Sequence, residues 1–304
     1  MSKNLKKLVF IELNGNKEYA MQGSIKDLYN DWLERAFPTA KSQTIKRHIS
    51  EWRSRNKGEY LGLGGEQNLF TPSGNGNKNV FVIGDLHFPF EHEKAFDFVM
   101  RVMELHPEIT ETVFLGDIID NHYSSFHDTD PDGLGGNVEY KKARKTLKKW
   151  YKAFPNAKVC TGNHDAIPQR KAFNAGLSAK WIKTLPEMYN IPGWVFKDYH
   201  KIGDFIFTHG LGQQVVSRAM NLGLSVIQGH THSKFGVQAF YNDKLKGHVQ
   251  YAIDGGCLID SEAYAFSYGK FGPVNKKGLT LIHDIEGVPV VTQYKFDDYL
   301  EGLI

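Results

Sequence analysis

The stretch Asn79-Val80-Phe81-Val82-Ile83-Gly84-Asp85-Leu86-His87 carries the signal that decides the fold. Four consecutive apolar residues end at a glycine, and a carboxylate and an imidazole follow. A short continuous apolar run of this kind is typical of a strand that is buried on both faces of a parallel sheet. We therefore expect a strand over 80–83, with Asp85 and His87 just beyond its carboxyl end.

The same arrangement, an apolar run followed by polar metal-binding residues, occurs four more times. The runs cover 112–115, 158–161, 205–208 and 224–228, and they lead into Gly116-Asp117-Ile118-Ile119-Asp120, Gly162-Asn163-His164-Asp165, Thr208-His209-Gly210 and Gly229-His230-Thr231-His232. Ligand crevices in open α/β sheets form beyond the carboxyl ends of the strands. The five motifs are therefore expected to meet in one crevice.

Helical patterns alternate with these strands. Apolar residues recur at helical spacing over 93–105 and 138–154, and further strand-like runs lie at 249–253, 279–283 and 288–294. Buried strands that alternate with amphipathic helices indicate a layered α/β domain.

The first 60 residues differ in charge from the rest of the chain. They hold 12 Lys and Arg against 7 Asp and Glu, a net +5, whereas the remainder is at −2. Strand-like runs over 8–13 and 18–21, joined by Asn14-Gly15-Asn16, predict a hairpin. Ser24 is expected to cap a helix, and a second, basic helix is expected to begin at Ser42 or Thr44. Together they predict a small α+β domain whose helices resemble a helix-turn-helix.

Composition suggests where the domains divide. Residues 61–78 are rich in Gly and Asn and are expected to be a linker between a basic domain at 1–60 and a catalytic domain at 79–304. The basic domain is interpreted as a possible DNA-binding module or, alternatively, as a small interaction or folding module. In the first case, four side chains would make the first phosphate or base contacts: Lys46, Arg47, Arg53 and Arg55.

Bulk properties narrow the class of protein. The chain has 304 residues, of which 41% are hydrophobic and 23% charged, as in ordinary globular proteins. No apolar stretch approaches the roughly 18–20 residues that span a bilayer. We therefore expect no membrane partner and a cytoplasmic location (the host cytoplasm if the gene belongs to a phage). Cys160 and Cys257 have no metal-binding spacing and are expected to be buried free thiols.

The ordered motif set resembles the calcineurin-like metallophosphoesterase family over about residues 79–295. This resemblance implies a layered α/β/β/α sandwich and hydrolysis of a phosphate ester. It implies that Asp85, His87 and His232 hold one metal ion, that Asn163, His209 and His230 hold a second, and that Asp117 bridges both. His209 is preferred to His200 and His248 because it directly follows an apolar strand.

The implied ligands suit two divalent ions. Mn²⁺ is favoured, and Mg²⁺, Fe, Ni and Zn are possible. Because two carboxylates leave much of the metal charge uncompensated, the site would attract a phosphate anion and acidify a bridging water. The resemblance therefore implies that a metal-bridging hydroxide attacks phosphorus.

Other residues of the motifs are given roles outside the metal shell. The resemblance implies that His164 faces the leaving group as a general acid or charge stabiliser, and Asp120 is expected to orient it. Asp165 is open to three interpretations: a helix cap, a support or a catalytic group. Five other histidines fit ordinary surface or core positions: His92, His106, His122, His127 and His283. Of these, His122 is close enough to the second motif to reach substrate.

The substrate is less constrained than the metal site. Residues 120–122 lack the arginine of the protein Ser/Thr phosphatase branch, and Asn163-His164-Asp165 is more similar to the phosphodiesterase and nuclease branches. Residues 141–152 carry seven basic side chains, either a solvated helix face or a track for a nucleic-acid backbone. We therefore expect a phosphodiesterase acting on nucleic acid. The alternatives are a protein or nucleotide phosphomonoesterase and a DNA-binding regulator with a non-catalytic phosphoesterase domain; the oligomeric state stays open.

Overall fold

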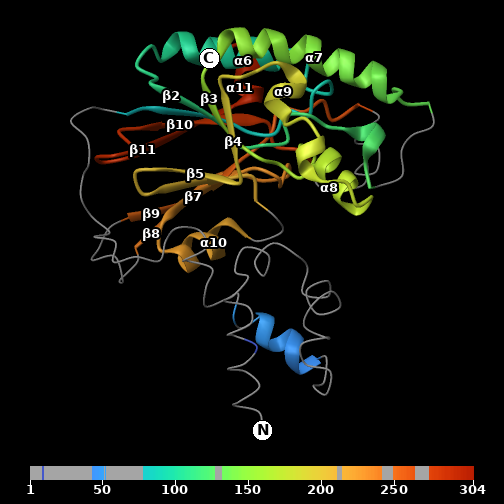
Figure 1. The fold of residues 1–304 in the computed structure, drawn as a ribbon. Helices are drawn as coiled ribbons and strands as arrows, with labels where there is room; N and C mark the ends of the chain where they lie inside the picture. Colours follow the sequence, from blue (N-terminus) through green and yellow to red (C-terminus); the bar gives the residue numbers. More distant parts are fainter. Residues whose placement is uncertain are drawn as a thin grey trace. The chain divides into compact units, whose positions relative to one another are not determined.

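A computed structural model describes Val9, residues 43–50, Trp52 and residues 78–126, 132–210, 214–241, 249–263 and 274–304. The chain divides into two compact units, Met1–Thr71 and Pro72–Ile304. Figure 1 draws both.

In the first unit, the described residues bear on two predictions. Residues 43–50 form a helix, as expected, with Ile45 and Ile49 buried and Lys46 and Arg47 at least partly accessible. Val9 is helical, so the strand expected over 8–13 is wrong at this residue. A short apolar run can serve a buried helix as well as a strand, and periodicity alone does not separate the two. The rest of the expected hairpin, the helix from Ser24, and Arg53 and Arg55 lie outside the described residues.

The second unit contains two sheets. The six-stranded sheet has the order β11-β10-β1-β2-β3-β4, in which β1 to β4 are parallel and β10 is antiparallel to β1. Its strands are β1 (Val80–Ile83), β2 (Glu111–Phe114), β3 (Ala157–Cys160), β4 (Trp194–Lys197), β10 (Gly278–His283) and β11 (Val290–Lys295).

The five-stranded sheet has the order β5-β6-β7-β9-β8, with β6, β7 and β9 parallel to one another. Its strands are β5 (Tyr199–Ile202), β6 (Phe205–Thr208), β7 (Ser225–Gln228), β8 (Phe235–Tyr241) and β9 (Val249–Gly255). Strand predictions at all five motif positions are therefore confirmed to within one residue at either end.

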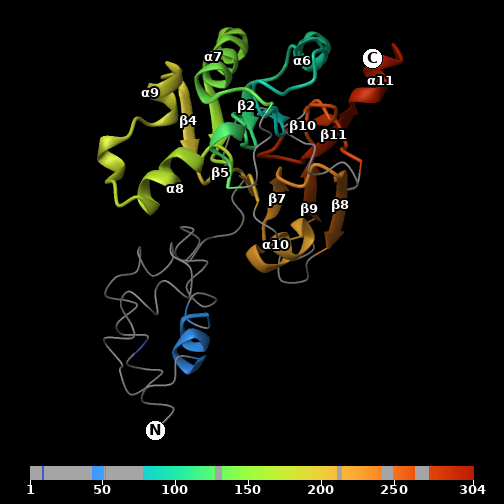
Figure 2. The ribbon, with the colours of Figure 1, turned by 90° about the vertical axis from the view of Figure 1, so that its right-hand side faces the viewer.

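Alternating side chains of β1 divide the core into two parts. Phe81 and Ile83 belong to a cluster shared with the helices, whereas Val80 and Val82 pack between the sheets with Phe205 of β6. The first sheet is covered by α6 (Ala95–Leu105), α7 (Gly136–Ala153), α9 (Leu185–Tyr189) and α11 (Phe296–Leu300). On the other side of the sandwich, α10 (Val215–Leu222) packs against β7 and β9 (Figures 1 and 2). The expected α/β/β/α layering is confirmed.

Helix α7 shows how its sequence divides between core and surface. Ala143, Leu147 and Trp150 lie at helical spacing and are buried, while all seven basic side chains of 141–152 are exposed.

Both cysteines are buried and free, as expected, and burial raises the pKa of Cys257 to about 12. Among the described helices, none is both long and apolar enough to cross a membrane.

Candidate metal centre

The five motifs follow β1, β2 and β3 of one sheet and β6 and β7 of the other. Contacts between their side chains bring the two sets of loops together. The backbone N–H of His230, after β7, donates to Asp85 Oδ2, after β1, over 2.8 Å. His209 Nε2, after β6, lies 3.1 Å from Asp117 Oδ2, after β2. The crevice therefore lies where the carboxyl edges of both sheets meet.

Several of the predicted ligands have a backbone that side chains rarely adopt. The φ angles of His87, Asp117 and His230 are 51°, 47° and 69°, in the left-handed region. Such conformations cost about 1–3 kcal/mol each and persist where the surrounding structure enforces them, commonly at functional sites.

Two motif glycines let the backbone approach the carboxylates closely. A Cβ atom added at Gly162 would lie 2.0 Å from Asp117 Oδ1, and one added at Gly229 would lie 2.3 Å from Asp85 Oδ1. Any larger residue would therefore displace a predicted ligand. No role for these glycines was predicted from sequence, although their place at the start of their motifs was the available signal.

The first group of ligand atoms comes from Asp85, His87 and His232, which all lie within 4.8 Å of one another. His232 Nε2 lies 3.0 Å from Asp85 Oδ2. The rings of His87 and His232 meet edge to face, with centroids 5.0 Å apart.

The second group comes from Asp117, His209 and His230, also within 4.8 Å of one another. His209 Nε2 lies 2.9 Å from Asn163 Oδ1 and 3.2 Å from His230 Nδ1. The same Asp117 oxygen that contacts His209 lies 3.5 Å from His87 Nε2, so Asp117 stands between the two groups.

The outer nitrogens of two imidazoles that are predicted ligands are already engaged. His87 Nδ1 lies 2.6 Å from Asp120 Oδ1, and His209 Nδ1 lies 3.0 Å from the carbonyl oxygen of Leu115. Each ring therefore presents Nε2 to the crevice, as in metal sites where an outer partner fixes the tautomer. With carboxylate, imidazole and amide donors converging in this way, the residues fit two divalent ions.

His164 lies beside these groups. Its Nδ1 is 2.7 Å from the carbonyl oxygen of Asp120 and 3.3 Å from Asp120 Oδ1, and its ring centroid is 4.6 Å from that of His87. Asp120 was expected to orient His164; its carboxylate makes the shorter contact with His87. One carboxylate thus contacts a predicted ligand and the predicted acid.

Charges in the crevice shift the pKa values of its groups. Burial alone would lower the pKa values of His164 and His209, but the nearby carboxylates outweigh it and raise both to about 9. Burial disfavours ionised Asp117, yet the charge of His209 and its hydrogen bond hold the pKa of Asp117 well below its usual range.

Asp165 supports the loops. Its Oδ1 accepts hydrogen bonds from the N–H groups of Ile118 and Ile119, and its Oδ2 accepts one from Gly162, each over 3.0 Å. It therefore fastens the second motif loop to the third. Burial, followed by repulsion from Asp117, raises the pKa of Asp165 to about 7.

His200, a rival of His209 for a ligand role, belongs to neither group of candidate ligands. His200 is buried, and its Nε2 lies 3.1 Å from the carbonyl oxygens of both Val159 and Val195. This ring nitrogen is therefore engaged by strand backbone. His122 is buried, with Nδ1 3.8 Å from Asp120 Oδ2. His127 and His248 lie outside the described residues.

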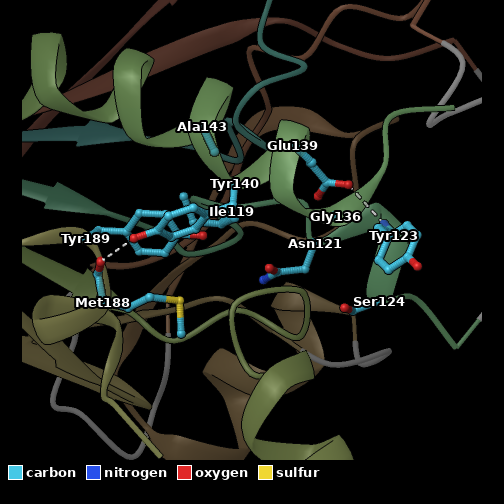
Figure 3. A pocket seen from close by; sticks show the side chains of 10 residues that line it. All are labelled: Ile119, Asn121, Tyr123, Ser124, Gly136, Glu139, Tyr140, Ala143, Met188 and Tyr189. Carbon is cyan, nitrogen blue, oxygen red and sulfur yellow. Dashed lines mark hydrogen bonds between the residues drawn. The ribbon is translucent and has the colours of Figure 1, made fainter.

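A pocket with aromatic walls adjoins the centre (Figure 3). Asn121 lines it and donates from Nδ2 to the carbonyl oxygen of His164 over 3.0 Å. Tyr140 and Tyr189 form another wall, and Glu139 accepts the N–H of Tyr123 over 2.9 Å. Asn121 therefore connects the pocket to the loop that carries His164.

A comparison with curated proteins finds no significant match. Among solved structures, a single mutant of Vps29 from Entamoeba histolytica is 16% identical, with a TM-score of 0.32, covering 72% of this chain and 99% of that one. Vps29 from Chaetomium thermophilum is 13% identical, with a TM-score of 0.35 and coverages of 72% and 93%. The NAD nucleotidase NadN of Haemophilus influenzae is 7% identical, with a TM-score of 0.33 and coverages of 71% and 49%.

The profile of the calcineurin-like phosphoesterases matches residues 78–265, which is more than half of the chain and includes every predicted ligand. The chain belongs to the calcineurin-like phosphoesterase family.

Proposed function

We propose that this chain is a dinuclear metal-dependent phosphodiesterase that acts on nucleic acid. The observation that carries the proposal is the position of Asp117. One of its oxygens lies 3.5 Å from His87 Nε2 and 3.1 Å from His209 Nε2, between two groups of candidate ligands.

In this proposal, Asp85, His87 and His232 hold one ion, Asn163, His209 and His230 hold the other, and Asp117 bridges them. Mn²⁺ is the favoured metal because the donors mix carboxylate and amide oxygens with imidazole nitrogens. Two such ions would polarise a phosphoryl oxygen and lower the pKa of bound water. Gly162 and Gly229 keep the space that Asp117 and Asp85 occupy.

His164 would act on the leaving group. Its Nδ1 is held at Asp120, so Nε2 is the atom left to donate a proton to the departing oxygen. Burial lowers the pKa of His164, whereas the hydrogen bond with Asp120 raises it and favours the protonated ring. Asp120 would act as a positioning residue for both His164 and His87.

Three features favour a nucleic-acid phosphodiester. The basic side chains of α7 are exposed on the side of the helix away from its buried residues. Arg170 and Lys171 of α8 (Ile167–Asn174) lie 4.7 and 5.3 Å from the ring of Phe126, close to the pocket loop. Tyr123, which lines the adjoining pocket and is exposed, would offer an aromatic surface to a base, which is a sequence-tolerant contact.

The N-terminal part would deliver the enzyme to its substrate. In this proposal residues 1–60 form a basic module, 61–78 a linker and 79–304 the catalytic domain. Lys46 and Arg47 on the helix 43–50, together with Arg53 and Arg55, would contact nucleic acid.

The test is hydrolysis with Mn²⁺ of bis-p-nitrophenyl phosphate, p-nitrophenyl phosphate and labelled single- and double-stranded DNA. Wild type should cleave the diester and DNA, and a chelator should abolish both activities. Asp117→Asn should be inactive while its circular dichroism stays that of wild type. Turnover of the monoester alone would replace this proposal with a phosphomonoesterase. No turnover of any substrate would favour a non-catalytic domain.

A further inference from the structure

A second group of metal-binding side chains lies outside the candidate metal centre. His106 follows α6, Glu108 lies between α6 and β2, and His283 ends β10. One ligand atom from each of the three lies within 4.8 Å of the other two. We call these residues the edge cluster.

Donor atoms of the edge cluster converge on one carboxylate. Glu108 Oε1 lies 2.7 Å from His106 Nδ1 and 3.7 Å from His283 Nδ1. The two imidazole centroids are 5.5 Å apart, with the rings inclined at 62°. The side chains of His106, Glu108 and His283 are 19%, 41% and 28% exposed, so a metal ion from solvent can reach them.

The edge cluster is separate from the candidate metal centre. In the sheet register, Val80 pairs with Glu111 on β2 and with Ile282 on β10, so the edge cluster adjoins the amino ends of β1 and β2. Asp85 and Asp117 follow the carboxyl ends of the same strands. A strand rises about 3.3 Å per residue, so four residues separate the two edges by about 13 Å.

Outer contacts fix both the ring of His106 and the backbone of the cluster. His106 Nε2 is hydrogen-bonded to the hydroxyl of Tyr294 on β11, which directs Nδ1 toward Glu108. Buried Asn79 donates from Nδ2 to the carbonyl oxygen of Glu108 and accepts the N–H of Asp284 at Oδ1, each over 3.0 Å. One amide therefore ties the Glu108 segment to the end of β10. A ring nitrogen engaged by an outer partner is also a feature of metal-binding histidines.

We propose that the edge cluster is a mononuclear zinc site. Two imidazole nitrogens and one carboxylate are a ligand set that suits Zn²⁺, whereas Mg²⁺ and Ca²⁺ prefer all-oxygen sites. Three protein ligands leave the fourth tetrahedral position to water. The site needs no contribution from the phosphoesterase centre, so it stands whether or not the proposed function is correct.

Occupancy would strengthen the fold. His106 and Glu108 lie far from His283 in the sequence, and a metal that holds such distant segments adds its binding free energy to folding. Zn²⁺ would join the end of α6, the entry to β2 and the end of β10. The consequence to be measured is a rise in Tm with Zn²⁺ that depends on these side chains.

The first experiment counts zinc on the full chain after equilibrium dialysis at micromolar Zn²⁺. The variants are Glu108→Gln and His283→Ala, and the matched control is Glu104→Gln, which removes an exposed carboxylate from α6. Wild type and control should retain one Zn²⁺ more than either variant, and Zn²⁺ should raise Tm further in the first pair than in the variants. Equal zinc content in all four proteins would overturn the proposal.

A second experiment needs no substitution, so an unfolded variant does not weaken the test. Wild type is treated with diethylpyrocarbonate with and without Zn²⁺, and modification is mapped by mass spectrometry. Zn²⁺ should slow modification of His106 and His283 at least about tenfold while leaving half-buried His92 unchanged. Equal rates at His106 and His283 with and without Zn²⁺ would show that no zinc binds there.

Discussion

The two edges of the six-stranded sheet carry candidate metal ligands in different settings. At the carboxyl edge, the side chains of Asp85, His87 and Asp117 are at most 2% exposed, and His87 and Asp117 have left-handed backbones. At the amino edge, the edge cluster is partly exposed, and His106 has an ordinary φ of −129°.

The difference in burial and backbone strain indicates how much each edge constrains its side chains. A buried cluster of carboxylates and imidazoles with strained backbone costs stability, and it persists because the surrounding structure enforces its geometry. A half-exposed cluster on unstrained backbone reduces the stability of the fold little, and the surrounding structure holds its side chains less rigidly. We therefore expect substitutions around the carboxyl edge to have larger effects than comparable ones at the amino edge.

Gly162→Ala should have the largest effect. The added methyl group would lie 2.0 Å from Asp117 Oδ1, so Asp117 must move and the centre should lose metal. Since changes to outer partners alone cost about 10–100-fold, turnover of bis-p-nitrophenyl phosphate should fall at least about 100-fold.

Gly135→Ala is the matched control, because a Cβ atom there meets nothing within 4 Å. Metal content and diesterase activity should remain those of wild type in this control. Full metal content in Gly162→Ala would contradict the placement of Asp117 as a ligand. Zinc at the edge cluster should be the same in both proteins, which would separate the two edges.

His164→Ala should leave the metal content intact and reduce kcat about 10²–10⁴-fold, the range for loss of a general acid. Its Nδ1 is held by Asp120, and its ring lies against His87. Activity and metal analysis on the same preparation provide the measurement. Loss of a metal ion would place His164 among the ligands instead.

Two substitutions, Asp120→Asn and Tyr294→Phe, compare the hydrogen-bond partners of the candidate ligands at the two edges. Asp120→Asn weakens the 2.6 Å contact with His87 Nδ1, and metal affinity or turnover should fall about 10–100-fold. Tyr294→Phe removes the partner of His106 Nε2 and should weaken zinc binding at the edge cluster less than about tenfold, because that cluster is partly exposed. Metal titrations of both variants give the comparison, and a larger effect at the edge cluster would reverse the ranking of the two edges.

The smallest expected effect is that of substituting Glu91, in the loop after the first motif, on the free energy of unfolding. Burial raises the pKa of Glu91 to about 7 from the usual 4.5. Between these values the unfolded chain releases the proton while the folded chain keeps it, so this carboxyl makes the protein less stable as pH rises from 4.5 to 7. Above pH 7 the penalty is constant.

Glu91→Gln should therefore raise the free energy of unfolding at pH 8 by about 2 kcal/mol and by much less at pH 4.5. Urea denaturation at the two pH values measures this, with Glu93→Gln, an exposed neighbour, as the control. An equal gain in the free energy of unfolding at both pH values would show that burial does not raise the pKa of Glu91.

The strands that the sequence did not predict are edge strands. β4, β5 and β8 were not predicted, and each lies at the edge of its sheet. In β8 most side chains are exposed or half-buried, so no continuous apolar run marks it. The predicted strands β1 and β7 have four buried residues each, and such runs are visible from sequence alone.

The sequence alone determined the local parts of the centre. An apolar strand followed closely by a candidate ligand is encoded within about ten consecutive positions. Five such segments in order, four of them with a glycine before the candidate ligand, predicted the ligand types and the crevice. Helix α7 was likewise readable from the spacing of Ala143, Leu147 and Trp150.

Only the tertiary structure decided which of these residues meet. That Asp120 contacts His87, that Asp165 binds two loops and that Gly162 faces Asp117 all depend on how loops from separate strands pack. His106 and His283 were interpreted as ordinary histidines, and sheet register brings them to the same carboxylate. Residues distant in sequence become neighbours through strand pairing and sheet packing, and the local pattern around each residue does not encode those contacts.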